Sequence, residues 1–586
     1  MALDTLAPLR FDVSAVTADI SAPARDPAID QLVEFFRNKG LDQLKREDRE
    51  EAWYQDWIDY QADHGLYAGL LSPSQYSSRG HRFDLRRLAR CLEVFAYFSP
   101  AHAYSLHVSF LGLFPILLSD NERLKQEAIN RLEAGELFAF AVSEQAHGSD
   151  LLANEFTVDE YTEAGANGLR AEGAKYYIGN ANAAGLISVL AKRAEGEGAP
   201  PTRRSGFLFF ALRPGESPGY QNVRKIRTLG IRPAFVGQFE VKNHRVAPGD
   251  VISQGREAWD AVFDTVNLGK FLLGFGAVGI CAHAFAEADQ HLRRRVLYGQ
   301  PTINMPHLRQ VMAVAYARLT AMKHYAFRSL DYVQTAGADD RRHLLFSAVQ
   351  KARVSTEGVK VMTMLSEAIG ARGLESQTYF EMALRDAQLI PGLEGSTHIN
   401  FSLTAQFIDN YFASSDDAQT PKSPAHGADV GENPYLMGPV DRNAKSVRFP
   451  DYLQAYRPLE SHQNVAVFAN QATAFRRFVI GGMVSHTRGE DATGLRIALG
   501  RCFSTIVYAQ LIAERCAASP ASPSMIAIIF HALIEDMSGE ALRLAPLLPP
   551  DSDERAQLER MITAPRTEAA DIEAVADVIA ARYDKA

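Results

Sequence analysis

Apolar and polar residues follow two different periods along this chain, and the period changes twice. Up to about residue 136, runs such as QLVEFFRN place apolar residues at helical spacing, so we expect a helical domain over 1–136. Between 137 and 253 the chain consists of short alternating or apolar runs separated by Gly, Asn and Pro, which predicts an antiparallel β-domain. Helical spacing returns over 254–410, where long runs predict a bundle of helices.

Two further segments follow this core. Residues 411–460 are rich in Pro, Gly, Asp and Ser, which is typical of a linker or a long loop. Residues 461–586 return to helical spacing and predict a C-terminal helical extension. The sequence therefore predicts an α+β multidomain fold, and helices on both sides of a β-domain leave clefts where a flat cofactor could lie.

Composition narrows the class of protein. The chain has 586 residues, of which 47% are hydrophobic and 22% charged, as in ordinary soluble globular proteins of several domains. The formal net charge of −9 argues against a broad nucleic-acid surface. The end of the chain points the same way, because residues 471–586 hold 12 Lys and Arg against 15 Asp and Glu.

Cysteine usage and hydropathy suggest where the protein works. The four cysteines form no C-x-x-C pair and no metal-ligand spacing, so we expect neither a disulfide framework nor a metal site. The most apolar windows are shorter than the ~20 residues of a membrane span, and the first residues do not resemble a secretory signal. We expect a cytoplasmic protein without a membrane span.

Two motifs in the β-domain could bind a cofactor, and each also has an ordinary structural explanation. AVSEQAHGSD (141–150) offers hydroxyls, a glycine and loop N–H groups to an anion or a flavin, but it could be a polar turn. EGAKYYIGN (172–180) places a tyrosine beside a glycine, where it could lie against a planar ring. The alternative for this second motif is a β-hairpin turn.

Three motifs in the helical region are equally open when taken singly. LRRRVLYGQP (292–301) could hold a pyrophosphate, or its arginines could complement a helix C-terminus. SEAIGARGL (366–374) is explained by helix termination. In RDAQLIPGLEGSTHIN (385–400), Glu394 lies in an apolar loop and could act as a general base, while Ser396 or Thr397 could cap a helix.

The order and spacing of these motifs resemble the acyl-CoA dehydrogenase superfamily, which includes the acyl-CoA oxidases. The resemblance covers about residues 25–410. SEQAHGSD is similar to the family's T-E-P-x-A-G-S-D, KYYIGN to K-x-W-I-T-N, and NLGK (267–270) to N-x-x-R. RVLYG is similar to R-x-x-F-G, EAIGARG to Q-x-x-G-G-x-G, and the later Arg-Asp and Glu-Gly-Ser to R-D and E-G-T.

This resemblance implies a homodimeric or homotetrameric FAD enzyme with an N-terminal helical domain, a middle antiparallel β-domain, a C-terminal four-helix bundle and an extra helical domain. The residues that it places around the flavin are Val142, Ser143, Ser149, Tyr177, Ile178, Gly179, Ser396 and His398. Those that would reach the FAD of a neighbouring subunit are Arg295, Leu297, Tyr298, Gly370 and Ala371. The thioester ligand would face Ser149, Asn267, Lys270 and Gly395.

The implied reaction is the α,β-dehydrogenation of an acyl-CoA or acyl-carrier-protein thioester to the trans-2-enoyl thioester. Glu394 would take the α-proton while the β-hydrogen leaves as hydride to flavin N5. An electron-transfer flavoprotein would accept the electrons; alternatively an oxidase would use O₂ and release H₂O₂, since AHGSD resembles the G-H-G-x pattern of that branch. A third class is a non-catalytic flavin-binding or nucleic-acid-associated member.

Five positions depart from the family pattern, and one of them is His147, which stands where the family has Ala. The family's Trp is Tyr177 and its Thr is Gly179, which removes one hydroxyl from the flavin site. Its Pro is Gln145, and its Arg is Lys270, which keeps the charge but loses the bidentate fork. These departures bear on the electron acceptor and the substrate, whereas the position of the base, Glu394, is intact.

Overall fold

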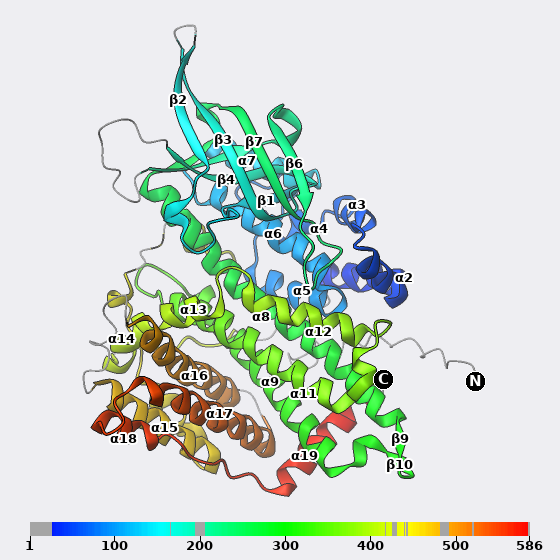
Figure 1. The fold of residues 1–586 in the computed structure, drawn as a ribbon, viewed down its shortest axis with the longest axis vertical. Coiled ribbons are helices and arrows are strands. Elements are labelled where there is room, and N and C mark those ends of the chain that lie inside the picture. The colour runs from blue at the N-terminus through cyan, green and yellow to red at the C-terminus, as the bar shows by residue number, and fades with distance from the viewer. Residues whose placement is uncertain are drawn as a thin grey trace. The chain divides into compact units, whose positions relative to one another are not determined.

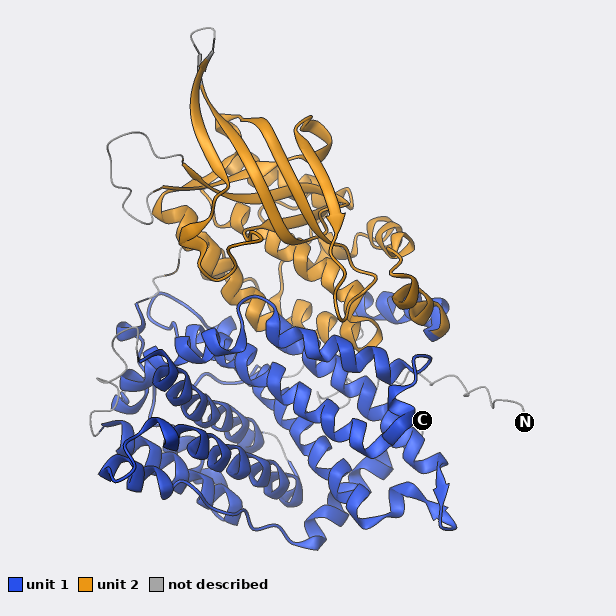
Figure 2. Cartoon of the chain, viewed as in Figure 1, with its two compact units in different colours: residues 1–41, 273–429, 442–586 blue, residues 42–272, 430–441 orange. Residues whose placement is uncertain are grey.

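The computed structural model describes residues 26–583 except 164–165, 194–205, 416–417, 425–429, 439, 441–442, 481–491 and 519–520. The chain forms two compact units (Figure 2). One contains residues 42–272 and 430–441, and the other contains residues 1–41, 273–429 and 442–586. The first of these is called the sheet unit below, and the second the helical unit.

Helices begin the chain (Figure 1). They are α2 (Pro27–Glu50), α3 (Gln55–Asp63), α4 (Leu66–Leu71), α5 (Leu85–Phe98), α6 (Pro100–Leu117) and α7 (Glu122–Glu133). Ser99 ends α5 and caps α6 through its hydroxyl, with Pro100 at the first helical position, where a missing N–H costs nothing. The cap of α7 is Asn121, whose side chain accepts the N–H of Leu124.

The strands of the sheet unit form one eight-stranded sheet (Figure 1). They are β1 (Leu137–Ala141), β2 (Thr157–Glu163), β3 (Ala166–Gly179), β4 (Ala184–Arg193), β5 (Phe207–Leu212), β6 (Tyr220–Lys225), β7 (Val236–Val246) and β8 (Val251–Gln254). Their order is β6-β7-β3-β2-β4-β5-β8, with β1 on β4. The buried core of this sheet includes Ala139, Phe156, Ile187, Phe210 and Phe239.

One detail of the predicted sheet is corrected by the structure. The sheet is mixed, because β1 and β2 both run parallel to β4 while the other pairs are antiparallel. Residues 172–192 do not form the alternative β-hairpin either, since β3 pairs with β2 and β7 rather than with β4. Alternating polarity predicts that a segment is a strand, but it carries no information on the direction of its neighbour.

Helix α6 packs tightly on β1. A Cβ on Gly112 would lie 2.6 Å from the backbone N and O of Ala139, so only glycine allows this approach. The hydroxyl of Ser188 in β4 donates to the Gly112 carbonyl at 2.7 Å, and Asn180 donates to the carbonyls of Ser105 and Phe138. These contacts hold the end of β3 against the helix.

After the first part of α2, the helical unit continues with the second part of α8 (Arg256–Arg294), a small hairpin of β9 (Val296–Leu297) and β10 (Gln300–Pro301), and α9 (Pro306–Gln334). Then come α10 (His343–Val349), one π-helical turn η5 (Gln350–Val354), α11 (Ser355–Ile369), α12 (Tyr379–Leu389), α13 (Thr397–Thr404) and α14 (Ile408–Ala413). The extension adds α15 (Gln463–Ile480), α16 (Thr493–Ala518), α17 (Pro523–Leu544), α18 (Asp553–Glu559) and α19 (Ala569–Tyr583).

The extension packs directly on the bundle through buried ion pairs. Asp536 of α17 lies 3.0 Å from Arg318 of α9 and 3.2 Å from Arg353 of η5. Lys360 of α11 lies 2.8 Å from the same carboxylate. Three cationic side chains on the bundle therefore share one carboxylate of the extension, so the two regions form one helical body.

Segment 411–460 is irregular but partly anchored. Its described residues form short 3₁₀ turns at Pro434–Met437, Ala444–Ser446, Tyr452–Ala455 and Arg457–Leu459. Within the sheet unit, the Glu432 carboxylate accepts the N–H groups of Ser74 and Phe83 and the hydroxyl of Ser74. The described part of the segment around Glu432 is thus anchored to the sheet unit.

The predicted order of helical domain, sheet domain, helical bundle and extra helices is confirmed. Two described helices, α8 and α16, are long and apolar enough to cross a membrane by length and composition alone, and 78% of each apolar window is buried inside the structure. Buried core helices of globular proteins have the same properties, so this is weak evidence for a span. All four cysteines are buried and none of them forms a disulfide.

Candidate functional site

In the sheet unit, the loop that follows β1 is held by a buried ion pair. Lys175 of β3 is fully buried, and its Nζ lies 2.8 Å from Oε1 of Glu144 and 3.1 Å from the Val142 carbonyl. The Glu144 carboxylate also accepts the N–H groups of Glu155 and Phe156. Burial lowers the pKa of Lys175 to about 8, although the Glu144 charge opposes this shift. Glu144 and Lys175 therefore stabilise the loop from its buried side.

The outer side of this loop presents polar groups. The Ser143 hydroxyl donates to the Tyr176 carbonyl at 2.7 Å, and the Tyr176 N–H donates to the Ser143 carbonyl, which ties the loop to β3. Ser149 is exposed, and a Cβ on Gly148 would meet no atom within 4 Å. Val142 is buried. The loop therefore offers hydroxyl and backbone groups on an open surface, which fits a polar planar cofactor.

Tyr177 is displayed by an irregularity in β3. The register between β3 and β7 shifts between Tyr176 and Ile178, and Tyr177 takes a left-handed φ of 64°. Such bulges re-aim a side chain and occur next to active sites. The Tyr177 ring is 59% exposed, whereas the Ile178 side chain is in the sheet core, so only the backbone of Ile178 could reach a ligand.

Gly179, where the family has Thr, is fixed by packing. A Cβ there would lie 2.7 Å from Val108 and 2.8 Å from Tyr104, both on α6. The hydroxyl is therefore missing because β3 and α6 approach too closely at this position for a side chain. On the first part of α8, Asn267 is partly exposed and Lys270 is buried.

In the helical unit, the arginine motif and the glycine motif come together. The Arg295 guanidinium would lie 3.9 Å from a Cβ on Gly370, which ends α11 with a φ of 70°. Burial lowers the pKa of His291, and the charges of Arg295 and Arg372 lower it further. Arg372 is paired with Glu375 at 3.4 Å, so Arg295 beside Gly370 is the cationic side chain here that would suit a diphosphate group.

The hairpin that follows Arg295 is exposed. Tyr298 is 94% exposed and Leu297 39%, and Tyr298 and Gly299 both have positive φ, as in a tight two-residue turn. Ala371 lies beside Gly370 in the 3₁₀ turn that ends α11. The predicted role of these residues toward a neighbouring subunit stays a prediction.

Glu394 occupies a strained position in the loop between α12 and α13. Its φ is 50°, and that of Gly395 is 90°. Non-glycine residues avoid this region, and those found there cluster at functional sites. Lys351 of η5 donates to the Ile390 carbonyl at 2.7 Å, and Asn400 of α13 donates to the carbonyls of Gly395 and Ser396. The loop is thus fixed before and after Glu394.

The interpretation of Ser396 as a helix cap is only half right. Ser396 stands at the N-cap of α13, but its side chain makes no capping bond and lies 3.0 Å from Nε2 of His398. The Thr397 hydroxyl donates to the Pro391 carbonyl instead. Ser396 and His398 therefore leave polar atoms beside Glu394 and Gly395.

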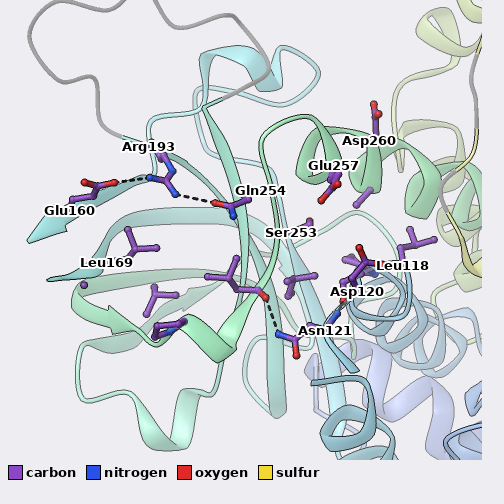
Figure 3. A pocket seen from close by; sticks show the side chains of 18 of the residues that line it. Leu118, Asp120, Asn121, Glu160, Leu169, Arg193, Ser253, Gln254, Glu257 and Asp260 are labelled. Atoms are coloured by element: carbon purple, nitrogen blue, oxygen red, sulfur yellow. Dashed lines mark hydrogen bonds and ion pairs between the residues drawn. The ribbon is translucent and has the colours of Figure 1, made fainter. Parts of the chain in front are cut away.

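A cavity of about 880 Å³ lies elsewhere in the sheet unit, between the α6–α7 connection, β2, β8 and the start of α8 (Figure 3). Its charged lining residues are Asp120, Glu160, Arg193, Glu257, Asp260 and Asp264. Arg193 already binds Glu160 at 2.8 Å and Gln254 at 3.0 Å (Figure 3). None of the predicted site residues lines this cavity, so it is separate from the candidate site.

Some side chains that hold these motif loops had no signal in the sequence. Lys351 and Asn400 lie within helical runs, where a single polar residue reads as an ordinary surface position. Arg372 was part of a glycine motif that helix termination explains. Within the described ranges, no group of three or more His, Cys, Asp or Glu side chains is placed to hold a metal ion.

Known proteins match this chain over the region that holds these motifs. The C-terminal domain model of the acyl-CoA dehydrogenase family matches residues 257–408. A cyclohexane-1-carbonyl-CoA dehydrogenase of Geobacter metallireducens is 24% identical over 326 residues, which are 55% of this chain and 81% of that protein. An acyl-CoA dehydrogenase of Bacillus subtilis is 25% identical over 348 residues, 59% of this chain and 87% of that protein.

Solved structures extend the match to the whole fold. An acyl-CoA dehydrogenase of Bacillus anthracis, solved with FAD, superposes with a TM-score of 0.71 at 17% identity and covers 94% of both chains. Butyryl-CoA dehydrogenase of Megasphaera elsdenii has a TM-score of 0.56 at 20% identity and covers 64% of this chain and 96% of its own. The first match thus includes the C-terminal extension, and the second does not reach all of it.

The sheet domain, the bundle and the motif loops together define a flavin-dependent dehydrogenase scaffold. Residues 257–408 of this chain match the acyl-CoA dehydrogenase family, and the fold as a whole is similar to that of acyl-CoA dehydrogenases, which are FAD-dependent oxidoreductases. These likenesses support FAD as its cofactor. Compared with the shorter of these structures, the chain adds a helical extension after the bundle.

Proposed function

We propose that this protein catalyses the α,β-dehydrogenation of an acyl thioester, with Glu394 as the base that removes the α-proton. The observation that carries the proposal is the left-handed backbone at Glu394, in a loop held from both sides. Such a conformation costs of order 1–3 kcal/mol and persists only where the surrounding structure enforces it. A carboxylate held in this way can be aimed at one carbon of a bound substrate.

Residues of both units fit FAD. In the sheet unit, the 142–150 loop with Ser143 and Ser149 and the exposed Tyr177 would line the flavin. In the helical unit, Arg295 and Gly370 form a separate cationic spot that, as the family resemblance implies, would reach the FAD of a neighbouring subunit. When bound, FAD supplies an acceptor for the hydride that leaves the β-carbon.

The remaining steps belong to this chain's own residues. The Glu394 carboxylate accepts the α-proton, and the Glu394 backbone N–H is the donor that would polarise the thioester carbonyl as negative charge develops on it. Asn267 and Lys270 of α8 would face the polar handle of the thioester.

Anaerobic flavin bleaching tests this proposal. The purified flavoprotein is mixed with a panel of acyl-CoA and acyl-carrier-protein thioesters of different chain length and branching, and flavin absorbance is followed in a stopped-flow instrument. We expect bleaching by one class of thioester and a loss of about 10²–10⁴-fold in its rate in Glu394→Gln. Equal rates in the two proteins would show that Glu394 is not the base.

The electron acceptor is proposed to be a separate electron-transfer flavoprotein. The alternative, O₂, is suggested by His147, which stands where the oxidase-like pattern has its histidine and lies 2.8 Å from Asp150. Mixing the reduced, product-bound enzyme with air distinguishes the two. Slow reoxidation supports the flavoprotein acceptor, whereas rapid reoxidation with release of H₂O₂ identifies an oxidase.

A further inference from the structure

The helix that runs from His343 to Ile369 is interrupted by the π-helical turn η5 (Gln350–Val354). A π turn inserts an extra residue into the α-helical repeat and is frequent at functional sites. Three polar side chains on this turn, Gln350, Lys351 and Arg353, are buried to 2% exposure or less. Such burial of long polar side chains is costly unless each has partners, so the turn has a specific structural task.

Lys351 connects this turn to the loop of the base. Its side chain is completely buried, and Nζ donates to the Ile390 carbonyl at 2.7 Å. The same carbonyl accepts the N–H of Leu393 at 3.1 Å. One carbonyl thus closes the tight turn that precedes Glu394 and is also clamped by an ammonium group, a charge-assisted bond that is stronger than a neutral one.

The turn that carries Lys351 is itself rigidly held. Arg353 Nη2 lies 3.2 Å from Asp536 and 3.4 Å from Glu357, and its Nη1 lies 3.6 Å from Glu540. On the other side, Gln350 packs so closely on α8 that a Cβ on Gly274 would lie 2.4 Å from its Nε2. The ammonium of Lys351 therefore extends from a frame that has little freedom to slide.

The loop has a second anchor on the far side of Glu394. The Asn400 side chain is completely buried and donates to the Gly395 carbonyl at 3.0 Å and to the Ser396 carbonyl at 3.1 Å. Between the two anchors lie the two positive-φ residues, Glu394 and Gly395. An unfavourable backbone conformation between two fixed points relaxes when either point is released.

We propose that Lys351 is a positioning residue for Glu394, because its bond to the Ile390 carbonyl holds the loop in the strained conformation that aims the carboxylate. This inference rests on the proposed function of Glu394 as the base. It concerns the geometry of proton removal and not the binding of substrate. Misplacing a reacting group by about 1 Å can cost 10²-fold in rate.

The first measurement is hydrogen exchange on the FAD-loaded protein without substrate. Lys351→Met keeps the length of the side chain and removes the donor. The control is Lys323→Met, which removes another buried lysine from α9 of the same unit. We expect the amides of 392–397 to exchange at least 10-fold faster in Lys351→Met only, with exchange in α9 and α16 unchanged. Unchanged exchange in the loop, or equal acceleration in the control, overturns the proposal.

The second measurement separates positioning from general damage. In anaerobic flavin reduction, Lys351→Met should lower the limiting rate about 10²-fold, leave the substrate concentration at half-maximal rate within about twofold, and raise the isotope effect for an α-deuterated thioester. Loss confined to substrate affinity, or a rate loss without a change in isotope effect, contradicts the proposal. If no thioester bleaches the flavin of either wild type or variant, the proposed function is refuted. The hydrogen-exchange data then still test whether Lys351 anchors the loop.

If Lys351→Met does not fold, Lys351→Gln takes its place, because it keeps an N–H donor on a shorter side chain. The same faster loop exchange and slower reduction are expected, in a smaller degree. If Lys351→Gln behaves like wild type in both measurements, the ammonium group is not required and the proposal is overturned.

Discussion

Removing the ammonium of Lys175 should loosen the loop that follows β1. In Lys175→Met, the Glu144 carboxylate stays buried without its cation, while two backbone N–H groups still reach it. Leaving one charge of a buried pair uncompensated costs about 3–5 kcal/mol. We therefore expect the free energy of local opening to fall by about that amount at the Phe156 amide, which donates to Glu144, and at the Tyr176 amide, which donates to Ser143.

Native-state hydrogen exchange measures this local free energy, which suits a protein of several parts better than a global unfolding transition. The control is Arg193→Met, which breaks an ion pair of the same 2.8 Å length to Glu160, with side chains 38% and 78% exposed. Exposed pairs contribute about 0–1 kcal/mol. A loss below about 1 kcal/mol in Lys175→Met, or equal losses in both variants, would refute the reasoning that burial makes the Glu144–Lys175 pair essential.

Three more predictions follow from single contacts. Burial lowers the folded pKa of Lys175 to about 8, below its value in an unfolded chain, so the folded state releases its proton first and loop stability should rise between about pH 8 and 10. The neutral amine still donates to Glu144 and to the Val142 carbonyl, which methionine cannot do, so Lys175→Met should lack this rise in exchange measurements and stay less stable than wild type. Gly112→Ala should lower the melting temperature, at a cost of about 1–3 kcal/mol or more, because its Cβ would overlap the Ala139 backbone, whereas Gly337→Ala, with no atom within 4 Å, should be nearly neutral in the same calorimetric scan. Asp536→Asn weakens the carboxylate that three bundle cations share, so limited proteolysis should release the C-terminal extension faster than in wild type; equal cleavage rates would show that apolar packing alone holds it.

Local signals in the sequence identified much of the fold. The change from helical to alternating periodicity predicted the succession of helices and strands: β1 begins at Leu137 and α8 at Arg256. The two compact units divide within α2 and within α8 instead. The order of the motifs also led to the family, with Glu394 in a loop between two helices. These predictions were possible because periodicity and motif spacing depend on residues that are neighbours in the sequence.

Contacts between distant segments could not be found in this way. Lys175 contacts Glu144 and Lys351 contacts Ile390, although the two residues of each pair lie far apart in the sequence. Each lysine resembles an ordinary polar residue in its own segment. The parallel pairing of β1 with β4 is likewise absent from the alternation of either strand.

The sequence by itself indicated the family resemblance, a candidate base and a set of residues predicted to line a flavin. Only the tertiary structure decided how the loops that carry them are held, because a strained residue such as Glu394 is stable only when packing and long-range hydrogen bonds enforce its backbone. Gly179 makes the same point, since its lack of a side chain looks like a lost cofactor contact in the sequence and is required by helix packing in the fold.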